Sequence, residues 1–164
     1  MSNRGGAGQQ MNGQKTPGPP IRVLLADADR HYRTLIRHLI HRDQRLEIVG
    51  EAEDGVEAIK LSLQVKPDVI VLDLCMPHMD GLQAVEGIQS VSPASRILAC
   101  SNLDENFGKQ AVDLGADDHT SKAAGWTEIR SRVIRLASEA SGRKRPTGND
   151  WVSPYLLAHL MGSP

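Results

Sequence analysis

The chain has 164 residues, of which 40% are hydrophobic and only 3% aromatic, so it can bury a sizeable core that must be mainly aliphatic. Its formal net charge of −1 at pH 7 gives no general case for binding to nucleic acid or to a membrane surface. No apolar run approaches the roughly 18 residues of a membrane span, and the N-terminus lacks the hydrophobic region of a signal peptide. Two cysteines are too few for a disulfide framework or a zinc set. These features predict a cytoplasmic protein without a membrane partner.

Composition divides the chain into three parts. Residues 1–20 are rich in Gly, Gln, Asn and Pro, which predicts a disordered N-terminal tail. Residues 21–141 alternate short apolar runs with amphipathic stretches, which predicts one folded domain. Residues 142–164 start with a short basic run and end in a Ser-Pro segment that resembles the start of a capped helix. We therefore expect a linker with a short C-terminal helix after the domain.

Within the domain, strands and helices are predicted to alternate. Short apolar or β-branched runs predict five strands, over residues 21–26, 46–52, 69–72, 97–100 and 117–121. Helical spacing of apolar residues predicts five helices, over residues 30–41, 55–66, 82–91, 105–114 and 126–140. Short connections between alternating elements are typical of an α/β fold, a doubly wound parallel sheet with helices on both faces.

Polar side chains follow four of the five predicted strands. The best example is Asp73, which ends the fully apolar strand over residues 69–72. Taken alone, Asp73 is more simply interpreted as a residue that ends a strand or caps a loop. However, Asp27, Ser101 and Lys122 stand at the ends of the first, fourth and fifth strands. Because the carboxyl ends of parallel strands meet at one edge of the sheet, we expect the four side chains to converge.

The chemistry of these four residue types indicates a phosphoryl site. Two carboxylates repel each other unless a cation or an ammonium group lies between them. Oxygen ligands select a hard ion such as Mg²⁺, which keeps several waters and shares phosphate oxygens. A lysine and a small hydroxyl group would complete a site for a phosphoryl group, and a carboxylate can itself be the nucleophile.

Residues 21–140 resemble a bacterial response regulator receiver domain. The matching pieces are Val23-Leu24-Leu25-Ala26-Asp27, the run from Leu72 to Gly81, Ser101, Gly115-Ala116 and Lys122. The local sequences Val49-Gly50-Glu51-Ala52 and Ser153-Pro154 are most similar to those of the NarL/LuxR class. The resemblance implies a flavodoxin-like (βα)5 fold with strand order 2-1-3-4-5. It also implies a phosphorelay function, in which a histidine kinase phosphorylates the domain and the domain switches conformation to control transcription or a partner.

The resemblance assigns a role to each residue of the expected site. Asp73 would be the phosphoacceptor, and Lys122 would pair with Asp73 or with the phosphoryl group. Asp27, Asp73 and the backbone carbonyl of Cys75 would hold Mg²⁺. The domain would not be an enzyme, beyond phosphoryl transfer to its own Asp73 and hydrolysis from it.

The resemblance also predicts how a phosphoryl group would be reported. Ser101 would hydrogen-bond a phosphoryl oxygen, and His119 stands where the family often has an aromatic switch residue. An exposed side chain on an edge strand is an equally good interpretation of His119. The face formed by the fourth helix, the fifth strand and the fifth helix would support a homodimer. DNA would be bound only through an output domain that these 164 residues do not contain, so they are either a fragment of a longer regulator or a single-domain regulator.

One departure from the family pattern bears on the metal site. The family normally has two adjacent acidic residues after the first strand, whereas this chain has Asp27-Ala28. Asp29, one position further on, could substitute directly or through water if the loop shifts. A missing carboxylate ligand should weaken Mg²⁺ binding and slow phosphorylation. The alternative function is therefore an atypical pseudo-receiver that acts as an interaction or dimerisation module without phosphorylation.

Overall fold

Five parallel strands form one sheet in the computed structural model, which describes residues 18–102 and 104–140. The strands are β1 (Ile21–Ala26), β2 (Leu46–Ala52), β3 (Val69–Leu72), β4 (Arg96–Ser101) and β5 (Asp118–Ser121). Their order is β2-β1-β3-β4-β5, and every neighbouring pair is parallel. The predicted doubly wound fold and strand order are therefore confirmed.

Five α-helices connect and follow the strands, together with one short 3-10 helix. They are α1 (Arg30–Ile40), α2 (Gly55–Val65), α3 (Gly81–Val91), α4 (Glu105–Asp113), η1 (Lys122–Ala124) and α5 (Trp126–Ala140). Aspartates cap the N-termini of the first four α-helices, where each side chain accepts hydrogen bonds from backbone N–H groups in the first turn. These caps are Asp29, Asp54, Asp80 and Asp104. Helix starts are thus set by local sequence.

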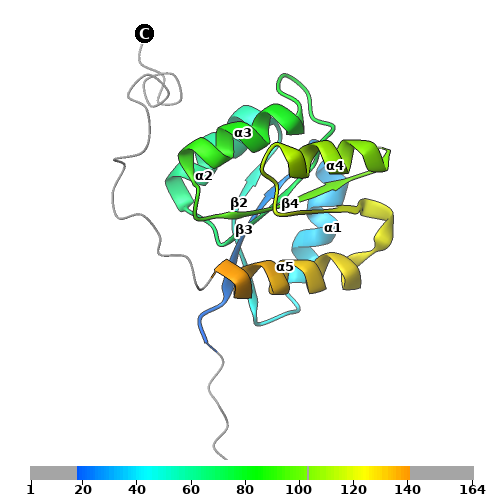
Figure 1. Ribbon diagram of the computed structural model, residues 1–164. Helices are drawn as coiled ribbons and strands as arrows, with labels where there is room; N and C mark the ends of the chain where they lie inside the picture. Colours follow the sequence, from blue (N-terminus) through cyan, green and yellow to red (C-terminus); the bar gives the residue numbers. More distant parts are fainter. Residues whose placement is uncertain (1–17, 103, 141–164) are drawn as a thin grey trace, which may run out of the picture.

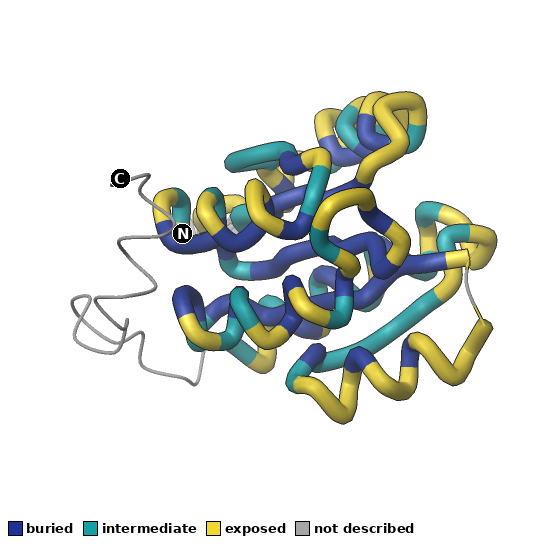
Figure 2. Tube along the Cα trace, turned by 90° about the horizontal axis from the view of Figure 1, so that it is seen from above, coloured by how far each residue is buried: buried dark blue, intermediate teal, exposed yellow. Residues whose placement is uncertain are grey.

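The sheet separates two aliphatic cores. Figure 1 shows α5 on one side of the sheet and α3 and α4 on the other. Because side chains alternate along a strand, neighbouring residues of β1 enter different cores: Leu24 packs on the α2–α3–α4 side and Leu25 on the α1–α5 side. The central strands are buried on both faces, as the dark blue segments in the middle of Figure 2 show. Burial on both faces explains why β3 is a continuous apolar run.

At the functional edge of the sheet, one strand ends later than predicted, and one short helix was not predicted. Ser101 is the last residue of β4 instead of following it, because Ser101 still pairs in register with Ser121 of β5. Lys122 starts η1, where the Ser121 side chain accepts a hydrogen bond from Ala123 N–H. The loop after Lys122 is therefore a single 3-10 turn.

The predicted N-terminal tail lies almost wholly outside the described residues, and the predicted linker and C-terminal helix lie wholly outside them. In the part of the chain that the structure describes, no helix has both the length and the apolar character needed to cross a membrane.

Candidate functional site

Asp27, Asp73 and Lys122 meet at the carboxyl edge of the sheet. The Lys122 ammonium Nζ lies 2.7 Å from Asp27 Oδ2 and 2.9 Å from Asp73 Oδ2. Asp27 follows β1, Asp73 follows β3 and Lys122 follows β5, so three strand ends supply the cluster. The sequence predicted this convergence from chain order alone, and the structure brings the three side chains into direct contact.

Burial makes the charges in this cluster strongly dependent on one another. Asp27 is 1% exposed and Asp73 is 5% exposed. Burial raises the pKa of Asp27, and the hydrogen bond from Lys122 only partly opposes that increase. For Lys122, burial by itself lowers the pKa, but the hydrogen bonds to Asp27 and Asp73 outweigh it, and the net pKa is raised. One ammonium group thus serves two carboxylates, which leaves the ionised cluster with one excess negative charge.

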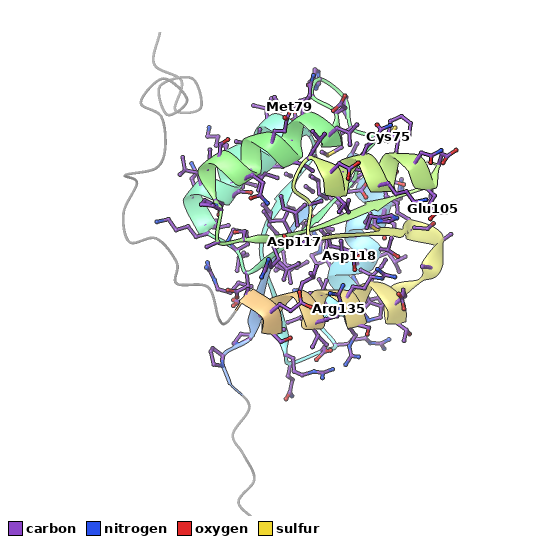
Figure 3. The ribbon with its side chains drawn as sticks, in the orientation of Figure 1. Cys75, Met79, Glu105, Asp117, Asp118 and Arg135 are labelled. Carbon is purple, nitrogen blue, oxygen red and sulfur yellow. The ribbon has the colours of Figure 1, made fainter. Side chains whose placement is uncertain are left out.

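The loop after β3 fixes the orientation of the Asp73 carboxylate. Asp73 Oδ1 accepts a hydrogen bond from Cys75 N–H at 3.0 Å, while Oδ2 faces Lys122. The loop then returns to Gly81 at the start of α3, where a Cβ atom would lie only 2.4 Å from the Asp73 carbonyl oxygen. A glycine at position 81 is therefore required by the close approach of α3 to the Asp73 backbone. Cys75 is exposed and Figure 3 shows it in this loop.

The residues after β1 differ in what they offer to a cation. Ala28 has no ligand atom, and Asp29 Oδ1 accepts the N–H groups of His31 and Tyr32 as the cap of α1. Among residues 18–102 and 104–140, no group of three or more His, Cys, Asp or Glu side chains is placed to hold a metal ion. Mg²⁺, however, is commonly held by one or two carboxylates together with water and phosphate oxygens. Asp27 and Asp73 supply two such carboxylates, and both contact the Lys122 ammonium group.

Ser101 and His119 lie beside a pocket next to the carboxylate cluster. The pocket has a volume of about 300 Å³ and lies between the ends of β4 and β5 and the start of α4. The His119 ring packs directly against α4, since a Cβ atom built at Gly108 would lie 2.1 Å from His119 Cδ2. The His119 backbone carbonyl accepts a hydrogen bond from Arg132 Nη1 on α5 at 3.1 Å. His119 is therefore half-buried between α4 and α5, instead of being a free side chain on an edge strand.

Two residues of the site were not singled out by sequence reasoning. Arg33 Nη1 donates a hydrogen bond to the Asp27 carbonyl at 2.5 Å, and its guanidinium pairs with Glu51 and Glu53 at the end of β2. The Tyr32 ring lies 4.8 Å from Lys122 Nζ. The position of Arg33 on the apolar face of the predicted helix was the available signal for this residue. Tyr32 fits the apolar spacing of the helix and gave no signal of its own.

The histidines of α1 and its C-cap are exposed, namely His31, His38 and His41. Cys100 is buried in the core on the α1–α5 side, and Trp126 packs against that core.

Comparisons with known proteins agree with this geometry. The family model of the response regulator receiver domain matches residues 23–134. Chemotaxis protein CheY of Listeria monocytogenes is 36% identical over 99 residues, which are 60% of this chain and 82% of that protein. The receiver domain of the response regulator NarL from Mycobacterium tuberculosis superposes with a TM-score of 0.68 at 32% identity, over 77% of this chain and all of that one.

A third group of relatives shares only part of its length with this chain. Protein-glutamate methylesterase/protein-glutamine glutaminase 1 of Methanospirillum hungatei is 37% identical over 67% of this chain but only 33% of its own length. The chain thus spans about a third of this methylesterase.

The chain belongs to the response regulator receiver domain family. Its function is that of the phosphoryl-accepting receivers of two-component signalling, as the residues at the strand ends predicted. Receivers of this family are not conventional enzymes, and they generally bind Mg²⁺. Both chemotaxis and NarL/LuxR proteins are among the relatives, so the comparisons define the family but no narrower class.

Proposed function

We propose that Asp73 is the phosphoacceptor of this receiver, with a histidine kinase as the phosphoryl donor. The observation that carries the proposal is the contact of Lys122 Nζ with both Asp73 and Asp27 at one edge of the sheet. A buried carboxylate that is held by one lysine and one backbone N–H group is oriented for attack on phosphorus.

Each side chain of the cluster has a separate task in this proposal. Asp73 supplies the oxygen that forms the new bond to phosphorus as the bond to the donor breaks. Lys122 stays close enough to pair with the phosphoryl oxygens, where an ammonium group stabilises developing charge. Arg33 holds the Asp27 carbonyl and thereby fixes the start of the loop that carries Ala28 and Asp29.

Mg²⁺ would be held by Asp27, Asp73 and the backbone carbonyl of Cys75, with Asp29 contributing through water. When bound, the ion would neutralise phosphoryl oxygens that Lys122 alone cannot cover. The excess negative charge of the cluster supports this assignment. Because Ala28 replaces the second acidic residue, we propose that the affinity for Mg²⁺ is lower than in receivers with two adjacent acidic residues.

For the output, we propose that Ser101 and His119 report the phosphoryl group to the face formed by α4, β5 and α5. Both residues line the pocket beside the cluster, and His119 contacts both helices of that face. Figure 3 labels one charged residue on each element: Glu105 on α4, Asp118 on β5 and Arg135 on α5.

We propose that the protein forms a homodimer through this face. We also propose that it is a NarL/LuxR-type regulator whose output domain binds DNA. In this proposal the receiver spans residues 21–141, with a tail over residues 1–20 and a linker over residues 142–164.

Mass spectrometry after incubation with acetyl phosphate and Mg²⁺ tests the proposed acceptor. We expect the wild-type chain to gain the mass of one phosphoryl group and Asp73→Asn to gain none. Ala28→Asp is the matched variant for the metal, and it should raise the affinity for Mg²⁺ by about tenfold because it adds a carboxylate ligand. If the wild type shows no mass gain at any Mg²⁺ concentration, the pseudo-receiver function replaces this one.

A further inference from the structure

The side chain of Lys122 has three distinct neighbours. An ammonium group carries three N–H donors. Two point at carboxylates, since Asp27 and Asp73 lie within 2.9 Å of Nζ. The third neighbour is the Tyr32 ring, whose centroid lies 4.8 Å from Nζ. That distance is within the roughly 6 Å over which an aromatic face attracts a cation.

The Tyr32 ring is itself fixed by contacts with other elements. Tyr32 belongs to the first turn of α1, which Asp29 caps by accepting its backbone N–H. At the other end of the ring, the hydroxyl group lies 3.7 Å from Cys100 Sγ on β4. Burial raises the pKa of the Tyr32 phenol, so the group beside Lys122 stays neutral. The ring is therefore held at both ends, by α1 and by β4.

Lys122 needs such a support because its own backbone restricts the position of its side chain little. It begins the three-residue helix η1, which ends at Gly125 with φ of 80°, and its long side chain has several rotatable bonds. A lysine that must face both Asp73 and an incoming phosphoryl group gains from a partner that limits these rotations.

We propose that Tyr32 is a positioning residue for the site, whose ring face holds the Lys122 ammonium group in line with the two carboxylates. The inference rests on the proposed function, in which Lys122 serves phosphoryl transfer to Asp73. The ring of Tyr32 acts through Lys122 and touches no reacting atom. A phenylalanine should replace it well and a leucine should not, because only an aromatic face attracts the cation.

Nuclear magnetic resonance of the metal-free chain tests the contact without any phosphorylation. Protons on the Lys122 side-chain carbon next to Nζ lie near the ring, so their signals should be shifted upfield in the wild type and in Tyr32→Phe. The shift should be lost in Tyr32→Leu, and Lys122→Met assigns the signals by removing them. A wild-type spectrum without an upfield Lys122 signal overturns the inference, whether or not the leucine variant folds.

The rate of phosphorylation by acetyl phosphate is the second measurement. We expect Tyr32→Leu to react about fivefold more slowly than the wild type, and Tyr32→Phe to match the wild type, because a cation over a ring is worth about 1 kcal/mol. His31→Ala, a neighbouring exposed position of α1, is the control and should react normally.

Two results of the rate measurement would overturn the inference, and a third would overturn the proposed function instead. A wild-type rate in Tyr32→Leu would overturn it. A loss in Tyr32→Phe equal to that in Tyr32→Leu would assign the effect to the hydroxyl group and would also overturn it. If the wild type itself is not phosphorylated, the proposed function fails, while the Lys122 spectra still decide whether Tyr32 holds the ammonium group.

Discussion

At the scale of single residues, the site is a buried cluster in which two carboxylates share one ammonium group. Lys122 is shared by Asp27 and Asp73, and neither carboxylate is more than 5% exposed. Ionised buried carboxylates cost free energy that their partner only partly offsets. That cost is consistent with a functional site, because a bound cation or a phosphoryl group changes the same balance of charge.

The pH dependence of stability follows from the raised pKa of Asp27. In the folded state the pKa of Asp27 is higher than its ordinary value of 3.8, so Asp27 keeps its proton to a higher pH. Its contribution to stability is therefore complete below pH 3.8 and is lost as the pH rises through the folded-state pKa. Asp27→Asn cannot lose a proton. In a chelating buffer, the free energy of unfolding of Asp27→Asn relative to wild type should therefore rise between pH 3.5 and pH 7.

Urea titrations of both proteins at the two pH values check this expectation. Subtracting the wild-type curve removes the contribution of carboxyl groups that do not interact with Asp27. An unchanged difference between Asp27→Asn and wild type at both pH values would contradict the raised pKa of Asp27.

At the scale of secondary-structure elements, α4 packs closely against β5 at a glycine. The His119 ring occupies the space that a side chain at Gly108 would need, and Arg132 on α5 holds the His119 carbonyl. Ring and helix are thus coupled, so a movement of one requires a movement of the other. This coupling is the physical basis for proposing His119 as a reporter of the phosphoryl group.

A double-mutant cycle tests the coupling between these two residues. Alanine is about 1 kcal/mol better than glycine inside a helix, so in the His119→Ala background Gly108→Ala should increase the free energy of unfolding by about 0.8 kcal/mol. In the wild-type background the same substitution should give no gain, because the new methyl group must displace the His119 ring. Equal gains in both backgrounds, measured by urea unfolding, would show that the ring and α4 are independent.

At the scale of the whole molecule, the face formed by α4, β5 and α5 combines charged pairs with an exposed apolar residue. Asp118 accepts hydrogen bonds from Arg132 and Arg135, which join β5 to α5. Val112 on α4 is 39% exposed and stands seven residues after Glu105, which places both on one side of the helix. An exposed apolar group on a face that also carries charge pairs suits a reversible contact between two copies.

Val112→Asp should weaken the proposed homodimer of the phosphorylated chain by about tenfold, because it places a charge in the proposed contact. Val56→Asp is a matched control, since Val56 is 44% exposed and lies on α2. Sedimentation velocity with and without acetyl phosphate measures the dimer, with Asp73→Asn as the unphosphorylated reference. Equal effects of the two valine substitutions would rule out this face as the interface.

The sequence by itself determined the fold and most of the site. Alternating strand and helix patterns require a parallel sheet, and a parallel sheet places all its strand ends on one edge. Asp27, Asp73, Ser101 and Lys122 could therefore be grouped without coordinates. That prediction rested only on the positions of these residues along the chain.

Only the tertiary structure decided how side chains from different elements contact one another. Tyr32 has the spacing of a core residue, yet its ring lies beside Lys122, and Gly108 makes room for His119 from another element. Periodicity gives the face of a helix on which a residue lies, but the neighbour that it meets depends on how the helix crosses the sheet and on side-chain rotamers. Those contacts are set by packing of the whole domain, which a local pattern does not contain.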